Sequence, residues 1–115
     1  MSSPTQRSLA YYRRRGWTVA VTERWNPHAK IRQDLWGWCD ILCFRGDRRG
    51  VLGIQTTSDS NFASRRKKLL ANPGLREFLM AGNSVERHGW RKAFNGRWKV
   101  RRRTITLGDF TEARL

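Results

Sequence analysis

The chain has 115 residues, of which 38% are hydrophobic and 11% aromatic, so it has the composition of one folded domain with a modest core. Its 24 Lys and Arg residues against 9 Asp and Glu residues give a formal net charge of +15, which indicates a polyanionic partner such as nucleic acid. No apolar run has the length of a membrane span, and the first residues lack the apolar core of a signal peptide. We therefore expect a single cytoplasmic domain over 1–115 that contacts no membrane.

The first third of the chain predicts one helix and one strand, followed by a loop. Ser3 can cap the helix, Pro4 suits its first turn, and Gly16 ends it. Alternating β-branched residues predict a strand over 17–23. The polar stretch 24–35 contains an Asn-Pro pair and is expected to form a loop.

Two apolar stretches, 36–44 and 51–57, flank a short basic turn and predict a β-hairpin. Two helical segments, 60–71 and 75–81, and two further strands, 84–90 and 97–107, follow it. This order of elements predicts an α/β fold, with an α-β-β-β-α-β core whose mixed central sheet is flanked by helices.

Both cysteines, Cys39 and Cys43, fall in the first strand of this hairpin. Their spacing places them on one face of a strand, but about 13 Å apart at 3.3 Å per residue, which is too far for a disulfide. We expect reduced core residues, as is typical of a cytoplasmic protein.

Each strand of the predicted hairpin carries one polar residue in an apolar stretch, Asp40 and Gln55. A lone carboxylate in such a place costs free energy unless a metal ion or a hydrogen bond compensates it. In a paired hairpin the two side chains can share a face, and Asp34 can approach the same place. Their oxygen atoms suit Mg²⁺, which activates water and stabilises charge on a phosphate. In the alternative, Asp40 accepts backbone hydrogen bonds at a strand end and Gln55 bridges two strands.

Basic and polar side chains around the hairpin are candidates for phosphate contacts, and Arg48 and Arg49, which flank the turn, are expected near enough to the metal site to hold a nucleic-acid backbone. Ser58 and Asn61 stand before a predicted helix whose N–H groups could hold a phosphate, although ordinary helix capping needs the same residues. His28 is expected in a solvated loop and His88 on a sheet surface, and no His or Cys spacing supports zinc. The candidate nucleic-acid contacts are Lys30, Arg32, Arg48, Arg49, Ser58, Asn61, Arg65, Lys67, Lys68, Arg91 and Lys92.

The order of elements resembles the PD-(D/E)xK nuclease superfamily over residues 5–90. An Asp heads the second predicted strand, a polar-x-polar motif lies in the third, and a basic helix follows. Within the superfamily the chain is similar to the small Holliday-junction-resolvase-like and VRR-NUC-like proteins. The stretches "ERWNPHAKIRQDLWGWCDIL", "GIQTTSDSN" and "HGWRK" are also similar to small phage and prophage proteins grouped with those nucleases.

The resemblance implies a restriction-endonuclease-like core and a DNA endonuclease that uses Mg²⁺ or Mn²⁺ to cut branched or structured DNA, leaving 5′-phosphates. It places Asp40 at the metal-binding Asp, Gln55 at the second metal-binding position, which is acidic in the family, and Thr57 at the position of the family's lysine. The sequence "IQT" thus departs from the family motif at two positions. One metal ligand loses its charge and the motif lysine is missing.

Other residues are expected to complete such a catalytic site. Glu23 or Asp34 would add a carboxylate, and Lys30, Lys67 or Lys68 would replace the missing lysine. The resemblance also implies a bacterial or phage-infected host cell, and a homodimer, since two strands must be cut.

Two other functions are also consistent with the sequence. The first is a nucleic-acid-binding protein on a nuclease-derived scaffold, in which "IQT" marks a decayed site. The second is a phage-encoded interaction protein whose basic face targets a host protein. DNA affinity that persists in EDTA and falls steeply with salt would favour the former of the two.

Overall fold

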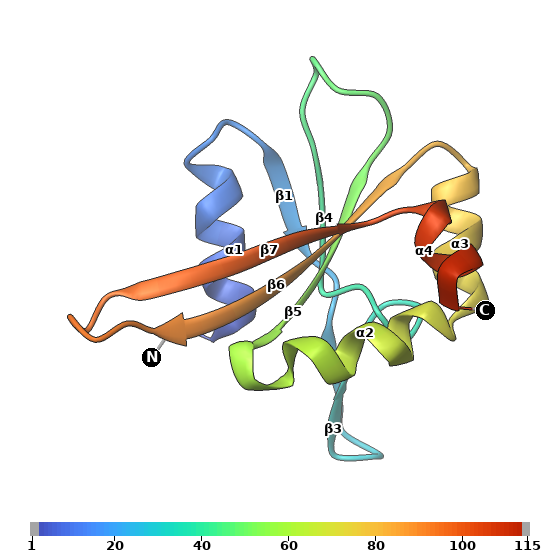
Figure 1. Cartoon of the computed structure of the whole chain (residues 1–115). Helices are drawn as coiled ribbons and strands as arrows, with labels where there is room; N and C mark the ends of the chain where they lie inside the picture. Colours follow the sequence, from blue (N-terminus) through green and yellow to red (C-terminus); the bar gives the residue numbers. More distant parts are fainter. Residues whose placement is uncertain (1–2, 114–115) are drawn as a thin grey trace.

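Figure 1 shows a computed structural model of the chain, which describes the backbone of residues 3–113 and the side chains of residues 3–111. Its centre is a mixed five-stranded sheet in the order β1-β4-β5-β6-β7. Strand β5 is parallel to β6, and the other neighbouring pairs are antiparallel. The strands are β1 (Thr18–Val21), β4 (Ile41–Phe44), β5 (Leu52–Ser58), β6 (Ser84–Lys92) and β7 (Trp98–Ile105). The predicted α/β fold with a mixed sheet flanked by helices is confirmed.

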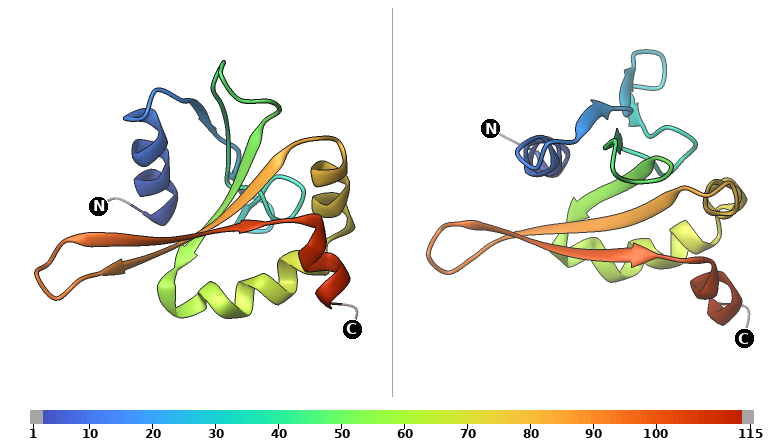
Figure 2. Two further views of the ribbon diagram at one scale, coloured as in Figure 1. Left: turned by 45° about the horizontal axis from the view of Figure 1, so that its top comes forward. Right: turned by 90° about the horizontal axis from the view of Figure 1, so that it is seen from above.

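Helix α1 (Pro4–Arg13) covers one face of the sheet (Figures 1 and 2). It begins as predicted, because the Ser3 hydroxyl accepts a hydrogen bond from the Gln6 N–H. Leu9 and Tyr12 of this helix pack in one core cluster with apolar residues of β4 and β5. The helix therefore lies along β5, with its first residues near one end of that strand and its last residues near the other.

Three helices cover the opposite face: α2 (Phe62–Leu70), α3 (Pro73–Met80) and α4 (Leu107–Ala113), with a short 3-10 turn before α2 at Asp59–Asn61. Their buried residues form a second core cluster with Trp38. No helix within residues 3–113 is long and apolar enough to cross a membrane.

The stretch predicted as a loop contains a small separate hairpin, β2 (Arg24–Asn26) paired with β3 (Ile31–Gln33). Its turn is closed by the Asn26 side chain, which accepts hydrogen bonds from the N–H groups of His28 and Ala29. Three-residue strands are too short to produce a readable alternation of apolar residues, so the loop prediction was wrong here.

The strand predicted over 36–44 begins only at Ile41. Before it, a bridge between Leu35 and Cys39 closes a turn, and Trp36 adopts a left-handed backbone conformation with φ of 59°. The turn breaks the alternation of the strand, so Cys39 and Cys43 pack in different core clusters rather than on one face. Both are buried and free, as predicted.

The last predicted strand, 97–107, ends at Ile105, and α4 follows it. The Thr106 N–H donates to the Asp109 carboxylate, and the Asp109 N–H donates to the Thr106 carbonyl. This reciprocal pair resembles a capping box with Asp in place of Glu. The sequence "TLGD" therefore carried a helix-start signal that the strand prediction overlooked.

Candidate metal centre

Three carboxylates meet at one end of the sheet, and we call them the acidic cluster: Glu23, Asp34 and Asp40. Each offers an oxygen atom, and these atoms all lie within 4.8 Å of one another. Glu23 lies just before β2, Asp34 just after β3 and Asp40 just before β4. The small β2–β3 hairpin therefore starts and ends at two of the three carboxylates, which fixes their separation.

Asp40 is the most deeply placed of the three, with 3% of its surface exposed. Burial and then a hydrogen bond with Asp34 raise the pKa of Asp40 well above its usual range, against the lowering effect of a hydrogen bond from the Thr56 N–H. That N–H lies 2.7 Å from Asp40 Oδ2. A divalent cation would offset the repulsion among these carboxylates and replace the proton on Asp40.

Gln55 adds an amide oxygen to this place. It lies on β5 one residue beyond the pair Ile41–Ile54, next to Asp40 just before β4, and only 2% of its surface is exposed. Its Nε2 donates to the Thr56 carbonyl, whereas its buried Oε1 has no hydrogen-bond partner among the side chains described. An unsatisfied buried acceptor costs about 1–3 kcal/mol, which a metal ion or a water molecule would offset.

The acidic cluster and Gln55 line one cavity of about 710 Å³, which we call the acidic cavity. The two predicted metal ligands, Asp40 and Gln55, are therefore brought together, as are the predicted supplementary carboxylates. Five predicted nucleic-acid contacts also line it: Arg32, Ser58, Asn61, Arg65 and Lys68. The cavity thus combines buried carboxylates with cationic and hydroxyl groups at its walls.

The position of the expected lysine is filled by Thr57, which is buried and lines the acidic cavity. Of the three lysines considered as its replacement, Lys68 lines the cavity from α2. Lys30 lies in the turn of the β2–β3 hairpin, with φ of 55°, and Lys67 lines a separate hollow on α2.

The remaining predicted nucleic-acid contacts lie away from the acidic cavity. Arg91 and Lys92 are exposed at the end of β6. Arg48 and Arg49 lie in the turn between β4 and β5 and line a different cavity. The expectation that they stand close to Asp40 was wrong, because the turn joins the other ends of these two strands.

Two threonines that the sequence did not single out support Asp40. Thr56 donates its N–H, and more weakly its hydroxyl, to Asp40 Oδ2. The Thr5 hydroxyl of α1 lies 2.8 Å from the Thr56 hydroxyl. Thr56 sits inside the polar "QTTS" run, which was a usable signal, whereas the contact of Thr5 joins residues 51 positions apart and has none.

His88 does not lie on a sheet surface as predicted; it is fully buried. Strand β6 is an inner strand, and α1 covers it there, which the alternation of polar residues did not reveal. The His88 ring joins the Ser8 hydroxyl on one side and the Glu86 carboxylate on the other. Burial lowers the pKa of His88. Because Ser8 is also fully buried, this Ser-His-Glu arrangement has no access to a substrate and is structural.

Comparison with protein-family models, curated proteins and solved structures finds no match. The chemistry of the acidic cavity therefore has to be inferred from its own residues. Three carboxylate groups and one amide oxygen form an all-oxygen donor set, which fits a hard divalent cation such as Mg²⁺ or Mn²⁺.

Proposed function

We propose that this protein is a metal-dependent DNA endonuclease of the PD-(D/E)xK type, which hydrolyses phosphodiester bonds at the acidic cavity. The observation that carries the proposal is the buried, unpartnered Oε1 of Gln55, a residue that lines one cavity together with the acidic cluster. A structural carboxylate cluster would not need an amide oxygen left without a donor beside it. A divalent cation would satisfy the carboxylates and the amide together.

The protein's own residues take distinct roles in this reaction. Asp40, Asp34 and Glu23 hold the metal, with Gln55 as a neutral fourth ligand. When bound there, Mg²⁺ or Mn²⁺ would supply an activated water molecule for the attack on the phosphorus atom and would stabilise the charge on the phosphate as the bond to the leaving 3′-oxygen breaks. Lys68 takes the place of the lysine that the family motif would have at Thr57.

The walls of the acidic cavity are suited to hold a phosphodiester in place. Arg32 comes from β3 and Arg65 from α2, so guanidinium groups approach the acidic cluster from two elements. Arg32 lies 3.8 Å from Glu23, which keeps one of these groups beside the carboxylates. Guanidinium groups bind phosphate oxygens with paired hydrogen bonds and position the phosphorus atom.

The side chains of the β2–β3 hairpin favour a substrate that contains unpaired bases, such as branched or structured DNA. Trp25 and Arg32 form a cross-strand pair, so both side chains lie on the same face of the hairpin. Arg32 lines the acidic cavity, while Trp25 remains 54% exposed beside it. An exposed indole next to a phosphate site provides a stacking surface for an unpaired base.

A second candidate function is nucleic-acid binding without cleavage. The replacement of the motif lysine by Thr57 favours it, because this residue has no positive charge to stabilise the transition state. In that case the acidic cavity would hold a cation or a proton for stability only, and DNA affinity would come from the basic residues.

One assay separates the two functions. Branched, duplex and single-stranded DNA are incubated with the protein in Mn²⁺ or in EDTA, and both cleavage and binding are followed on gels. We expect Mn²⁺-dependent cleavage that Asp40→Asn abolishes while binding persists, because Asn has the shape of the protonated Asp40. Glu77→Gln, which removes an exposed carboxylate outside the cavity, should cut like the wild type. Equal cleavage by Asp40→Asn would reject the site, and binding without cleavage would favour the second function.

We extend the proposal to a homodimer, since cutting both strands of a branch needs two acidic cavities. Light scattering on the protein with and without a branched DNA would measure the assembly. A DNA complex that contains two protein chains is expected, and a complex with one chain would contradict the dimer.

A further inference from the structure

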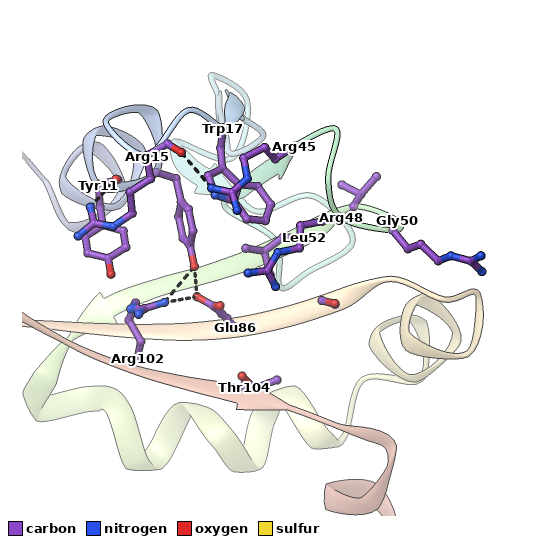
Figure 3. A pocket seen from close by; sticks show the side chains of 14 residues that line it. Tyr11, Arg15, Trp17, Arg45, Arg48, Gly50, Leu52, Glu86, Arg102 and Thr104 are labelled. Carbon is purple, nitrogen blue, oxygen red and sulfur yellow. Dashed lines mark hydrogen bonds and ion pairs between the residues drawn. The ribbon is translucent and has the colours of Figure 1, made fainter.

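A second cavity, of about 480 Å³, lies at the opposite end of α1 from the acidic cavity. Figure 3 shows it between the end of α1, the turn that joins β4 to β5, and the strands β6 and β7. Its outstanding feature is five arginines drawn from separate parts of the chain, and we call it the arginine pocket. They are Arg15, Arg45, Arg48, Arg49 and Arg102.

Two of these guanidinium groups are held in place by the protein. Arg102 donates to the Tyr12 hydroxyl and to the Glu86 carboxylate, and that carboxylate also accepts hydrogen bonds from Tyr12 and His88. Arg45 makes two hydrogen bonds to Asp47. The pocket therefore has a partly fixed arrangement of donors, which reduces the ordering cost of binding.

The positive charge of the arginine pocket is not balanced by its surroundings. Glu86 is the one carboxylate among the described residues that line it, and its Oε1 already has three partners. Arg15, Arg48 and Arg49 have no ion pair with any carboxylate in the part of the chain that the structure describes. Like charges that converge without counterions are stabilised by an anionic ligand.

The aromatic rings of the pocket indicate which part of a nucleic acid it can take. The guanidinium carbon atoms of Arg15 and Arg102 lie 3.5 and 4.9 Å from the centre of the Tyr11 ring. Arg45 lies 5.2 Å from the centre of the Trp17 ring. These rings already stack on arginines, so the pocket offers N–H donors rather than a free surface for a base. Phosphate oxygens are the acceptors that match such donors.

The separation of the two cavities follows from the elements that they share. Thr5 lines the acidic cavity and Tyr12 the arginine pocket, and seven residues of α1 at the helical rise of 1.5 Å span about 10 Å. On β5, Thr57 and Leu52 line the same two cavities, and five residues at 3.3 Å span about 16 Å. A DNA strand advances at least about 3.4 Å per nucleotide, the value for a stacked strand, and its phosphates also wind around the axis, so these distances correspond to no more than roughly five nucleotides.

We propose that the arginine pocket binds a backbone phosphate of the strand whose scissile phosphate lies at the acidic cluster, within about five nucleotides of the cut. The proposal rests on the proposed function, and it adds a second, fixed contact to it. The pocket then determines where along a strand the acidic cavity is placed.

The experiment compares two double variants that each lose two positive charges. Arg15→Gln/Arg48→Gln removes two unpaired arginines of the pocket, and Arg76→Gln/Arg97→Gln removes two arginines that line neither cavity. Binding of a labelled 12-nucleotide single strand is measured by fluorescence anisotropy in EDTA over a range of salt. We expect the pocket variant to bind about 10-fold more weakly, with a salt slope lower by about 0.7, because one single-strand phosphate contact contributes about 0.7. Equal losses in both variants would overturn the proposal.

The position of the contact is measured with strands that carry one uncharged methylphosphonate at a time, in Ca²⁺. We expect two sensitive linkages that are not adjacent and that lie within about five nucleotides of each other. Sensitivity at one should disappear in Asp40→Asn, and sensitivity at the other in Arg15→Gln/Arg48→Gln. Because no cleavage is needed, a failure of the nuclease function leaves this result readable. A single sensitive linkage, or an Arg-dependent one next to the Asp40-dependent one, would contradict the proposal.

Inorganic phosphate tests whether the pocket takes a free anion instead. We expect 10 mM phosphate to displace the strand from the wild type less than threefold. If inorganic phosphate alone bound to the wild type as tightly as the strand, and not to the Arg15→Gln/Arg48→Gln variant, the pocket would be a site for a free anion and not for a strand.

Discussion

The two ends of α1 contact opposite kinds of charge. Near Thr5, two half-buried carboxylates approach the buried Asp40, whose pKa is raised by its burial and by Asp34; near Arg15, several guanidinium groups line one cavity with few carboxylates to balance them. The positive charge that gives a net charge of +15 is therefore not distributed evenly over the protein. One cavity is suited to a cation and the other to an anion, and a DNA strand with a divalent metal at one of its phosphates would supply both.

The largest effect is expected for a variant that loses cleavage and keeps DNA binding, because the two activities are assigned to different cavities. Removing two carboxylates in Glu23→Gln/Asp34→Asn should lower Mn²⁺-dependent cleavage by at least about 100-fold, because both act as metal ligands. DNA affinity in EDTA should remain within threefold of the wild type, since the arginine pocket is unchanged. Single-turnover cleavage and anisotropy measure the two quantities. A parallel loss of cleavage and EDTA-resistant binding would show that the two cavities do not act separately.

The exposed Trp25 is expected to make the protein bind branched DNA more tightly than duplex DNA. Trp25→Ala should weaken binding to a branched DNA by about 1–3 kcal/mol, the usual contribution of base stacking on an aromatic ring, and binding to a plain duplex far less. Trp25→Phe should recover most of the affinity, because it keeps an aromatic face. Titration of both substrates by anisotropy is the measurement. Equal losses on duplex and branched DNA would reject the stacking role.

Gln55 tests whether its buried amide oxygen is kept for a ligand. Gln55→Met has a similar volume and removes the unpartnered Oε1, so in EDTA the free energy of unfolding should rise by about 1 kcal/mol. The increase in melting temperature that Mn²⁺ gives the wild type should become smaller. Chemical denaturation in EDTA and thermal unfolding in Mn²⁺ would show both. A variant that is less stable in EDTA would indicate that the amide is structural.

The smallest effect concerns pH, to which Asp40 and His88 respond in opposite directions. The pKa of Asp40 is raised on folding, so without metal the folded protein keeps a proton that the unfolded chain loses above about pH 4. Stability in EDTA therefore decreases as the pH rises from about 4 toward the pKa of the folded state. In Asp40→Asn this decrease should be absent.

His88 gives the opposite dependence. Its pKa is lowered on folding, so the unfolded chain takes up a proton below about pH 6.5 that the folded protein does not, and stability decreases as the pH falls below 6.5. Urea denaturation of Asp40→Asn in EDTA between pH 5 and 8 isolates this contribution. A variant that gained stability on acidification from pH 6.5 would contradict the buried, neutral His88.

Sequence patterns predicted the parts of the site that neighbouring strands determine. Asp40 and Gln55 interrupt two apolar stretches joined by a turn, so pairing of these strands brings the two residues to one place. The roles of Thr5 and His88 were not predictable in the same way. Each depends on how α1 packs over strands 50–80 residues away along the chain, and no local pattern carries that information.

The arginine pocket illustrates the same limit of local patterns. Arg48 and Arg49 were expected at the metal because they belong to the hairpin that carries Asp40. Asp40 lies at the open end of this hairpin, however, whereas the turn that carries the two arginines lies at its other end, far from the acidic cluster. Arg15 joins them from the turn after α1 and Arg102 from β7, so the pocket exists only once the sheet and helix are assembled.

The central claim is that the acidic cluster with Gln55 holds a divalent cation. Titration of Mn²⁺ into the wild type, Asp40→Asn and Glu77→Gln, with free Mn²⁺ counted by electron paramagnetic resonance, tests it most directly, because the strong positive charge of the protein suppresses unspecific cation binding. We predict saturable Mn²⁺ binding by the wild type and by Glu77→Gln, and none by Asp40→Asn at the same concentrations. Identical titrations of all three proteins, or no binding by the wild type, would contradict the account.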